Sequence, residues 1–212
     1  MRFFSTIVMS KDVMPGLMAG ALLASASFAA SAQDATATDL VSGTYEADHP
    51  HSAVMFQTNH LGLSTFVARF DDYTTRLELN ADDLSKSTLE VVLEPASVDI
   101  NLPLFAEHMS AESWFDVANH PEVTFKSTKF EQTSPTEGTV TGDLTIRGVT
   151  KPLTLAVRLV GAGVHPMAQV PAFGIEARGV VMRSEYGMTS ALPLIPDEVH
   201  LIINAEFHQQ QD

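Results

Sequence analysis

Residues 48–70 alternate between hydrophobic and polar positions on either side of one short turn. The alternation runs along residues 53–58 and resumes along residues 66–70. A period of two is typical of a strand whose two faces meet different surroundings. Residues 60–64 contain Gly62, which can adopt a positive φ without strain, so they are predicted to form the turn. The pattern predicts an antiparallel hairpin with one apolar face.

Similar runs continue along most of the chain. They occupy residues 76–80, 88–93, 123–130, 139–146, 153–160, 173–181 and 199–207. With the opening hairpin they make about eight to ten strands, at the spacing expected of an all-β barrel or sandwich. A short helical excursion is predicted near residues 102–117, where Pro103 suits a first helical turn and several apolar residues can share one face. We expect this helix to cover an open end of a barrel.

The N-terminus has the features of a secretory signal peptide. An uncharged apolar stretch ends at an A-x-A sequence at residues 30–32. We therefore expect a cleaved signal peptide at residues 1–32, a disordered lead-in at residues 33–42 and one domain at residues 43–212. An uncleaved membrane anchor is the alternative interpretation. The leader favours an exported protein and, with the composition below, a periplasmic one.

Composition narrows the function classes. The chain has 26 acidic and 12 basic residues, a formal net charge of −14, and no cysteine. A surface this acidic repels phosphate backbones, which argues against nucleic-acid binding. The absence of cysteine excludes disulfides, thiol catalysis and thiolate metal sites.

Several short motifs, in this order along the chain, resemble those of YceI-like proteins. They are Tyr45, Asp48, His51, Ser52, Val54, Phe56, His60, Gly62, Ser64, Phe70, the stretch at 96–99, His108, Phe115, Asp116, Pro121, Phe125, and the stretches at 142–152, 183–188 and 197–199. The resemblance covers nearly all of the expected mature domain. It implies an extended, lipocalin-like (calycin-type) antiparallel barrel of about eight strands.

The same resemblance implies a function. The apolar lumen of such a barrel would bind a polyisoprenoid, such as the tail of a quinone, or another long-chain amphiphile. The binding would be non-covalent and non-catalytic, and the protein would act as a periplasmic carrier. Some relatives are thought to work with membrane cytochromes of the b561 type, and relatives often form dimers. An accessory electron-transfer partner and a homodimer are therefore implied possibilities.

One segment departs from the family pattern. Many relatives carry arginines and an aspartate around the residue that matches His108, whereas residues 105–111 here contain neither. If this segment borders the mouth of the cavity, the preference for a ligand head group differs from that of those relatives. A long apolar ligand is thus the better supported expectation than a quinone in particular.

The candidate ligand-binding residues are inward-facing residues of the strands and the helix, histidines near the mouth, and a tyrosine in a loop that could close the cavity. They are Val54, Phe56, His60, Phe66, Phe70, Leu79, Leu93, Phe105, His108, Phe115, Phe125, Ile146, Phe173, Ile175 and Tyr186. The apolar members fit either a filled core or the lining of a lumen, because small barrels usually fill themselves with side chains. His51, His60 and His108 could donate to a head group, or could instead cap turns or pair with Asp48 or Asp99.

Other chemistries have weaker signals. His49 and His51 lie on one side of a strand pattern, and His60, His120, His200 and His208 are further imidazoles, which leaves a metal-binding stress protein as an alternative. The spacings of dedicated metal sites are missing, so no metal ligand is predicted. No hydrolase or nucleotide-binding motif occurs, and no catalytic residue is predicted. An enzyme acting on an isoprenoid remains a further alternative.

Overall fold

The computed structural model describes residues 39–100 and 102–211. The predicted signal peptide and the first part of the predicted lead-in, residues 33–38, lie outside them. Residues 39–42 are described and contact the domain, since the Tyr45 hydroxyl donates to the carbonyl oxygen of Val41 at 2.7 Å.

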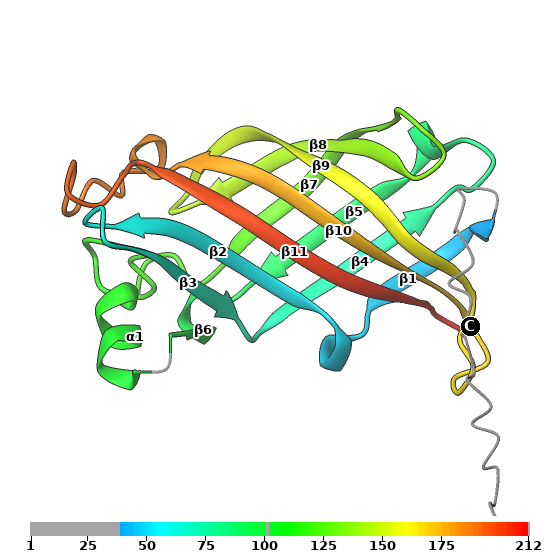
Figure 1. The fold of residues 1–212 in the computed structure, drawn as a ribbon, viewed down its shortest axis with the longest axis horizontal. Helices are drawn as coiled ribbons and strands as arrows, with labels where there is room; N and C mark the ends of the chain where they lie inside the picture. Colours follow the sequence, from blue (N-terminus) through cyan, green and yellow to red (C-terminus); the bar gives the residue numbers. More distant parts are fainter. Residues whose placement is uncertain (1–38, 101, 212) are drawn as a thin grey trace, which may run out of the picture. The chain divides into compact units, whose positions relative to one another are not determined.

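The strands form one closed antiparallel barrel (Figure 1). In chain order they are β1 (Gly43–Ala47), β2 (Ala53–His60), β3 (Ser64–Phe70), β4 (Tyr73–Leu79), β5 (Thr88–Leu93), β6 (Val98–Asp99), β7 (Val123–Gln132), β8 (Glu137–Ile146), β9 (Val149–Val164), β10 (Pro171–Met182) and β11 (Glu198–Gln209). The neighbours run β1-β4-β5-β7-β8-β9-β10-β11, and β11 pairs back with β1, where Tyr45 lies opposite Gln209. This ring confirms the predicted all-β barrel of about eight strands.

Two of the ring's strands are broken and continue in a second segment. The same edge of β11 pairs with two strands. The C-terminal end of β11 pairs with β1, and the part nearer the start of β11 pairs with β2, where His200 lies opposite Gln57. The 3-10 turn His49–His51 fills the break between β1 and β2. In the same way, β3 leads into β4 through two residues. Beyond the breaks, β2, β3 and β6 extend the barrel wall, because β2 pairs with β11, β3 with β2 and β6 with β3.

Two turns adopt the left-handed backbone that the sequence predicted for one of them. In the β2–β3 turn, φ is 57° at Leu61 and 72° at Gly62. In the β8–β9 turn, φ is 51° at Arg147 and 72° at Gly148. Two consecutive positive φ values are the mark of a type I′ turn, whose twist matches that of paired strands.

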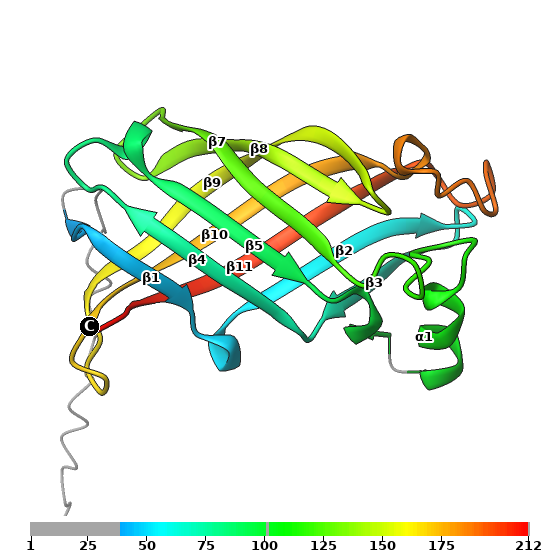
Figure 2. The same cartoon turned by 180° about the vertical axis from the view of Figure 1, so that it is seen from behind.

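The helix α1 (Pro103–Ser110) lies at the end of the barrel where the β2–β3 turn is found (Figures 1 and 2). It is shorter than the predicted 102–117, because residues 111–119 form turns instead. Its buried residue is Met109, and the Phe105 ring meets the Phe66 ring edge-on at 5.9 Å. The helix therefore packs on the β2–β3 end, as a cover for the barrel. No helical segment in the described ranges combines the length and hydropathy that a bilayer crossing requires.

Candidate functional site

The interior of the barrel contains a cavity of about 620 Å³. This volume lies within the roughly 300–1,000 Å³ of small-molecule sites in proteins. The wall includes His60 and Leu194 at the α1 end and Leu40 and Pro135 at the opposite end. The cavity therefore extends along the barrel, and the barrel is not filled by its own side chains.

Carbon atoms form nearly all of the cavity wall. The alternation predicted from the sequence explains this, because every second residue of a strand points to the same face. The inward rows of β8 to β11 are Val140, Leu144, Ile146, Leu153, Leu155, Val157, Leu159, Phe173, Ile175, Ala177, Val181, Val199, Leu201, Ile203, Ala205 and Phe207. A surface of this kind excludes water and favours hydrocarbon.

A chain of aromatic rings lines the cavity near α1. Phe56 lies 6.1 Å from Phe66 and 5.4 Å from Phe70, measured between ring centroids. Phe70 in turn meets Phe115 edge-on at 5.7 Å, and Phe66 meets Phe105. These rings belong to β2, β3, α1 and the turns after it, so the cover and the barrel wall are packed as one unit.

Arg183 is the buried basic residue of the wall. Only 3% of it is exposed, and it sits at the end of β10, where it lines the cavity. Its Nε, Nη1 and Nη2 donate to the carbonyl oxygens of Pro196, Met188 and Ile195, at 2.9, 2.7 and 2.8 Å. The guanidinium also lies over the Trp114 ring at 5.3 Å. Burial lowers the pKa of Arg183, while the Asp197 carboxylate opposes that shift.

Arg183 therefore has a structural task and a position from which it can act on a ligand. A guanidinium has five N–H donors. Three hydrogen bonds hold the loop at residues 187–197, and the cation remains at the cavity wall. A partly desolvated cation beside a ring is a strong partner for an oxygen with negative charge.

Most of the residues predicted for ligand binding lie along this wall. Those are Val54, Phe56, His60, Phe66, Phe70, Leu79, Leu93, Phe105, Phe115, Phe125, Ile146, Phe173 and Ile175. The structure brings them together from strands far apart in the sequence.

His108 and Tyr186 are placed elsewhere. The indole N–H of Trp114 donates to Nε2 of His108 at 2.9 Å, and the His108 ring stacks on Phe105 at 5.6 Å. The His108 side chain is exposed. Tyr186 is 3% exposed and packs within the core cluster around Val181 and Met188, where burial raises its pKa. Neither lines the cavity, so the geometry favours structural roles for both.

His51 takes the alternative role considered for it. Its Nδ1 is hydrogen-bonded to the Asp48 carboxylate, which raises the pKa of His51. Sequence reasoning missed Trp114 as the partner of both His108 and Arg183. The signal was available only in part: Trp114 was among the apolar residues of the predicted helix, but contacts between loops leave no periodic pattern.

Comparison with known proteins shows the family of this chain. The family model described as the YceI-like domain matches residues 45–207. The chain belongs to the YceI-like family. A UPF0312 protein of Serratia proteamaculans is 33% identical over 201 residues, covering 93% of this chain and 97% of that protein. A Protein YceI of Salmonella arizonae is 33% identical over 178 residues, covering 83% of this chain and 92% of that protein.

Solved structures show the same fold as this YceI-like chain. BcnA of Burkholderia cenocepacia superposes with a TM-score of 0.68 at 18% identity, covering 76% of this chain and 98% of that one. A YceI protein of Campylobacter jejuni gives 0.66 at 24% identity, covering 72% and 90%. A domain from Saccharophagus degradans, described as polyisoprenoid-binding and implicated in plant cell wall breakdown, gives 0.58 at 14% identity, covering 78% and 98%. At these identities the likeness concerns the fold.

Proposed function

We propose that this YceI-like protein is a periplasmic carrier that binds a polyisoprenoid, or a similar long-chain amphiphile, inside its barrel. The observation that supports this most directly is the apolar cavity of about 620 Å³ along the barrel. Empty volume in a core is destabilising, so a barrel without a ligand to hold would be expected to fill this space with its own side chains. A structural neighbour described as polyisoprenoid-binding supports the same ligand class.

The energetics favour a long apolar tail. Burial contributes about 0.8 kcal/mol per CH₂, so an isoprene unit of about five carbons contributes about 4 kcal/mol. Association costs roughly 4–15 kcal/mol, and micromolar affinity needs a further ~8 kcal/mol. About three to six isoprene units therefore suffice, without any single head-group contact. The binding step involves no covalent chemistry.

We place the polar head group at the α1 end. Arg183 and His60 line the wall there. A carbonyl or phosphate oxygen would accept hydrogen bonds from these side chains, so a quinone-like or phosphorylated isoprenoid fits better than an amine. A quinone would also connect the protein to a b561-type cytochrome. The periplasmic location depends on cleavage of the predicted signal peptide at residues 1–32.

Substitution of neighbouring residues on β11 tests the cavity. Ile203 lines the wall, whereas Ile202, next to it on the strand, points to the outer face. We expect Ile203→Asp to lose bound lipid, because a carboxylate in an apolar tunnel is strongly unfavourable for a hydrocarbon tail. Ile202→Asp should retain it. The measurement is organic extraction of purified protein followed by mass spectrometry, with circular dichroism to show that both variants are folded.

Equal lipid in the two folded variants would contradict the proposal, and so would a wild-type protein that yields no lipid from any preparation. Ultraviolet absorbance of the extract before and after borohydride reduction identifies the head group. A change in the spectrum indicates a quinone, and an unchanged spectrum indicates another amphiphile.

A further inference from the structure

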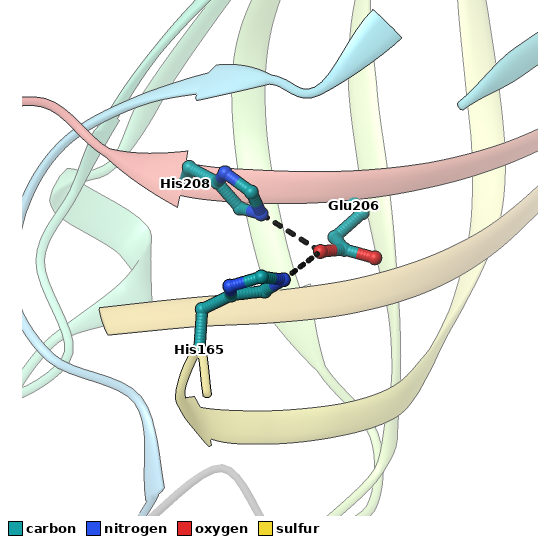
Figure 3. Close-up of side chains that lie close together, drawn as sticks. All are labelled: His165, Glu206 and His208. Atoms are coloured by element: carbon teal, nitrogen blue, oxygen red, sulfur yellow. Dashed lines mark hydrogen bonds and ion pairs between the residues drawn. The ribbon is translucent and has the colours of Figure 1, made fainter. Parts of the chain in front are cut away.

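Three side chains capable of binding metal meet on the outer surface, at the end of the barrel opposite α1. They are His165, Glu206 and His208, and their ligand atoms all lie within 4.8 Å of one another. In Figure 3 both imidazole rings point toward the same oxygen of Glu206. Its Oε1 lies 3.5 Å from Nε2 of His165 and 2.7 Å from Nε2 of His208. The three side chains are partly buried, with 21–32% exposed.

The strand pattern explains the meeting of two of these residues. Phe207 points into the cavity, so Glu206 and His208 both point outward from β11. His165 follows β9 directly, in the turn that leads to β10. Two backbone hydrogen bonds of 2.8 Å close this turn: the His165 N–H donates to the Val170 carbonyl oxygen, and the Gln169 N–H donates to the His165 carbonyl oxygen. The turn brings the His165 ring to 4.7 Å from the His208 ring, measured between centroids.

The position of Glu206 is held from the other side by the segment between β1 and β2. The Asp48 N–H donates to the Glu206 carbonyl oxygen at 2.7 Å, and the Glu206 N–H donates to the Ser52 hydroxyl at 3.0 Å. Asp48 and His51 also lie within 4.8 Å of the Glu206 carboxylate. The Glu206 carboxylate therefore lies among four side chains, on a backbone held by two hydrogen bonds, and a held ligand reduces the ordering cost of binding an ion.

We propose that His165, Glu206 and His208 bind a divalent transition-metal ion of the zinc class. Two imidazoles and one carboxylate form an established donor set for Zn²⁺, with water in the fourth tetrahedral position. The imidazoles favour such ions over Mg²⁺ and Ca²⁺, which prefer oxygen ligands throughout. Bonds of about 2.0–2.2 Å place neighbouring ligand atoms roughly 3.4 Å apart in a tetrahedron. The separation between Glu206 and His165 is already 3.5 Å, and the 2.7 Å hydrogen bond between Glu206 and His208 must lengthen to admit the ion. The site is independent of the lipid cavity and of the proposed carrier function.

The same strand contains an internal comparison. Glu198 and His200 lie outward on β11 with the same spacing as Glu206 and His208, and Nε2 of His200 lies 2.8 Å from Glu198 Oε1. A glutamate–histidine pair is thus present twice on one strand, and among the described residues the second pair alone is joined by a third donor, from the β9–β10 turn. The difference between the two pairs isolates the contribution of His165.

Metal binding has a structural consequence in the turn. The backbone N–H groups of Ala168 and Met167 donate to Nδ1 of His165, at 2.9 and 3.3 Å. Nδ1 is therefore an acceptor in the metal-free protein, and the proton of the neutral ring lies on Nε2. Coordination through Nε2 moves that proton to Nδ1, which ends these two hydrogen bonds. The turn at residues 165–169 must rearrange when the ion binds.

Calorimetric titration of metal-free, untagged full-length mature protein with Zn²⁺ tests the site. We expect one-to-one binding in the wild type. The affinity for Zn²⁺ should fall by about 100-fold or more in His165→Ala and in Glu206→Gln. Loss of a metal ligand costs at least as much affinity as loss of a residue that hydrogen-bonds to a ligand. His200→Ala, the matched control on the same strand, should bind as the wild type does. Excess Mg²⁺ should not compete.

The replacement of His165 lies in a turn with exposed neighbours, so the variant is expected to fold, which circular dichroism would show. Co²⁺ absorption provides a second readout, with d–d bands of tetrahedral intensity in the wild type and in His200→Ala only. Amide exchange should change at residues 165–169 on addition of Zn²⁺. No one-to-one Zn²⁺ binding, or binding equally strong in His165→Ala, would overturn the proposal and leave three hydrogen-bonded side chains. An equal loss in His200→Ala would indicate adventitious binding to surface histidines and would overturn it as well.

Discussion

At the scale of single residues, a small polar network holds the loop that follows β10 against the barrel. The Ser184 N–H and hydroxyl donate to the two carboxylate oxygens of Asp197, at 2.7 and 2.6 Å. The Arg183 N–H donates to the Asp197 carbonyl oxygen at 3.0 Å. The hydrogen bonds from Ser184, aided by the charge of Arg183, lower the pKa of Asp197 below its ordinary 3.8. This network keeps Arg183 in place beside the cavity.

The lowered pKa predicts how the stability of this loop depends on pH. A carboxyl group with a depressed pKa stabilises the folded state above its ordinary pKa, and that contribution disappears as the pH falls through the folded value. Asp197→Asn should therefore cost about 1 kcal/mol of unfolding free energy at pH 7, and progressively less below about pH 4. Urea denaturation at several pH values measures this.

Ser184→Ala provides the control for that prediction, since it removes the hydroxyl hydrogen bond to Asp197 and keeps the one from the backbone N–H of residue 184. The two substitutions should be coupled at pH 7, and the coupling should weaken as the pH falls through the lowered pKa of Asp197. A coupling that does not change with pH would show that the charge of Asp197 is not involved.

At the scale of elements, alternation predicted the inner and outer rows of the strands, but the room available to each inward side chain is decided by neighbouring strands. Gly142 of β8 is an example. A Cβ added there would lie 2.5 Å from the Lys126 carbonyl oxygen and 2.5 Å from the Phe125 ring on β7. The Phe125 ring covers the glycine, which no local pattern in β8 indicates. Gly161 of β9 has nothing within 4 Å of its added Cβ.

These two glycines should respond to alanine in opposite directions. Gly142→Ala should destabilise the barrel by about 1–3 kcal/mol, because the ring and the backbone of β7 must move. Gly161→Ala should be neutral or stabilise it by about 0.4–1 kcal/mol, because it restricts the unfolded chain. The free energy of unfolding in urea measures both. Destabilisation of equal size would show that strand flexibility, rather than the contact with β7, determines the outcome.

The helix shows the limit of element prediction from sequence. Pro103 correctly indicated its start, and the place of a helix within a β chain correctly indicated a cover for the barrel. The predicted end was wrong by several residues, because Trp114 and Phe115 reach the barrel from turns rather than from a continued helix. Apolar residues three or four positions apart fit both arrangements.

At the scale of the whole domain, exposed leucines gather at the α1 end of the cavity. Leu63 in the β2–β3 turn, Leu104 in α1 and Leu194 in the loop after β10 are 83%, 72% and 68% exposed. The figures show these three segments at one end of the barrel, with the β9–β10 turn at the other (Figures 1 and 2). An apolar rim around the mouth of an apolar tunnel is suited to contact with a lipid surface.

If the proposed carrier exchanges its ligand through this rim, one substitution there should slow the exchange. Leu104→Ser should reduce the rate of lipid transfer to zwitterionic vesicles by about tenfold, the equivalent of one exposed leucine that no longer becomes buried. Met167→Ser is the matched control, because Met167 is 88% exposed at the opposite end. Stopped-flow transfer of a fluorescent lipid measures the rate, and equal rates in the two variants would exclude the α1 end as the portal.

The sequence by itself determined which face of each strand is apolar, where the hairpins turn and that the chain belongs with YceI-like barrels. These properties follow from local periodicity and from turn residues such as Gly62, so they can be read along one strand at a time. The tertiary structure alone decided that the inward rows enclose open space and that His165 meets Glu206 and His208. Both depend on how distant strands close the ring, and the distance across a barrel or around its rim is not encoded by any local pattern.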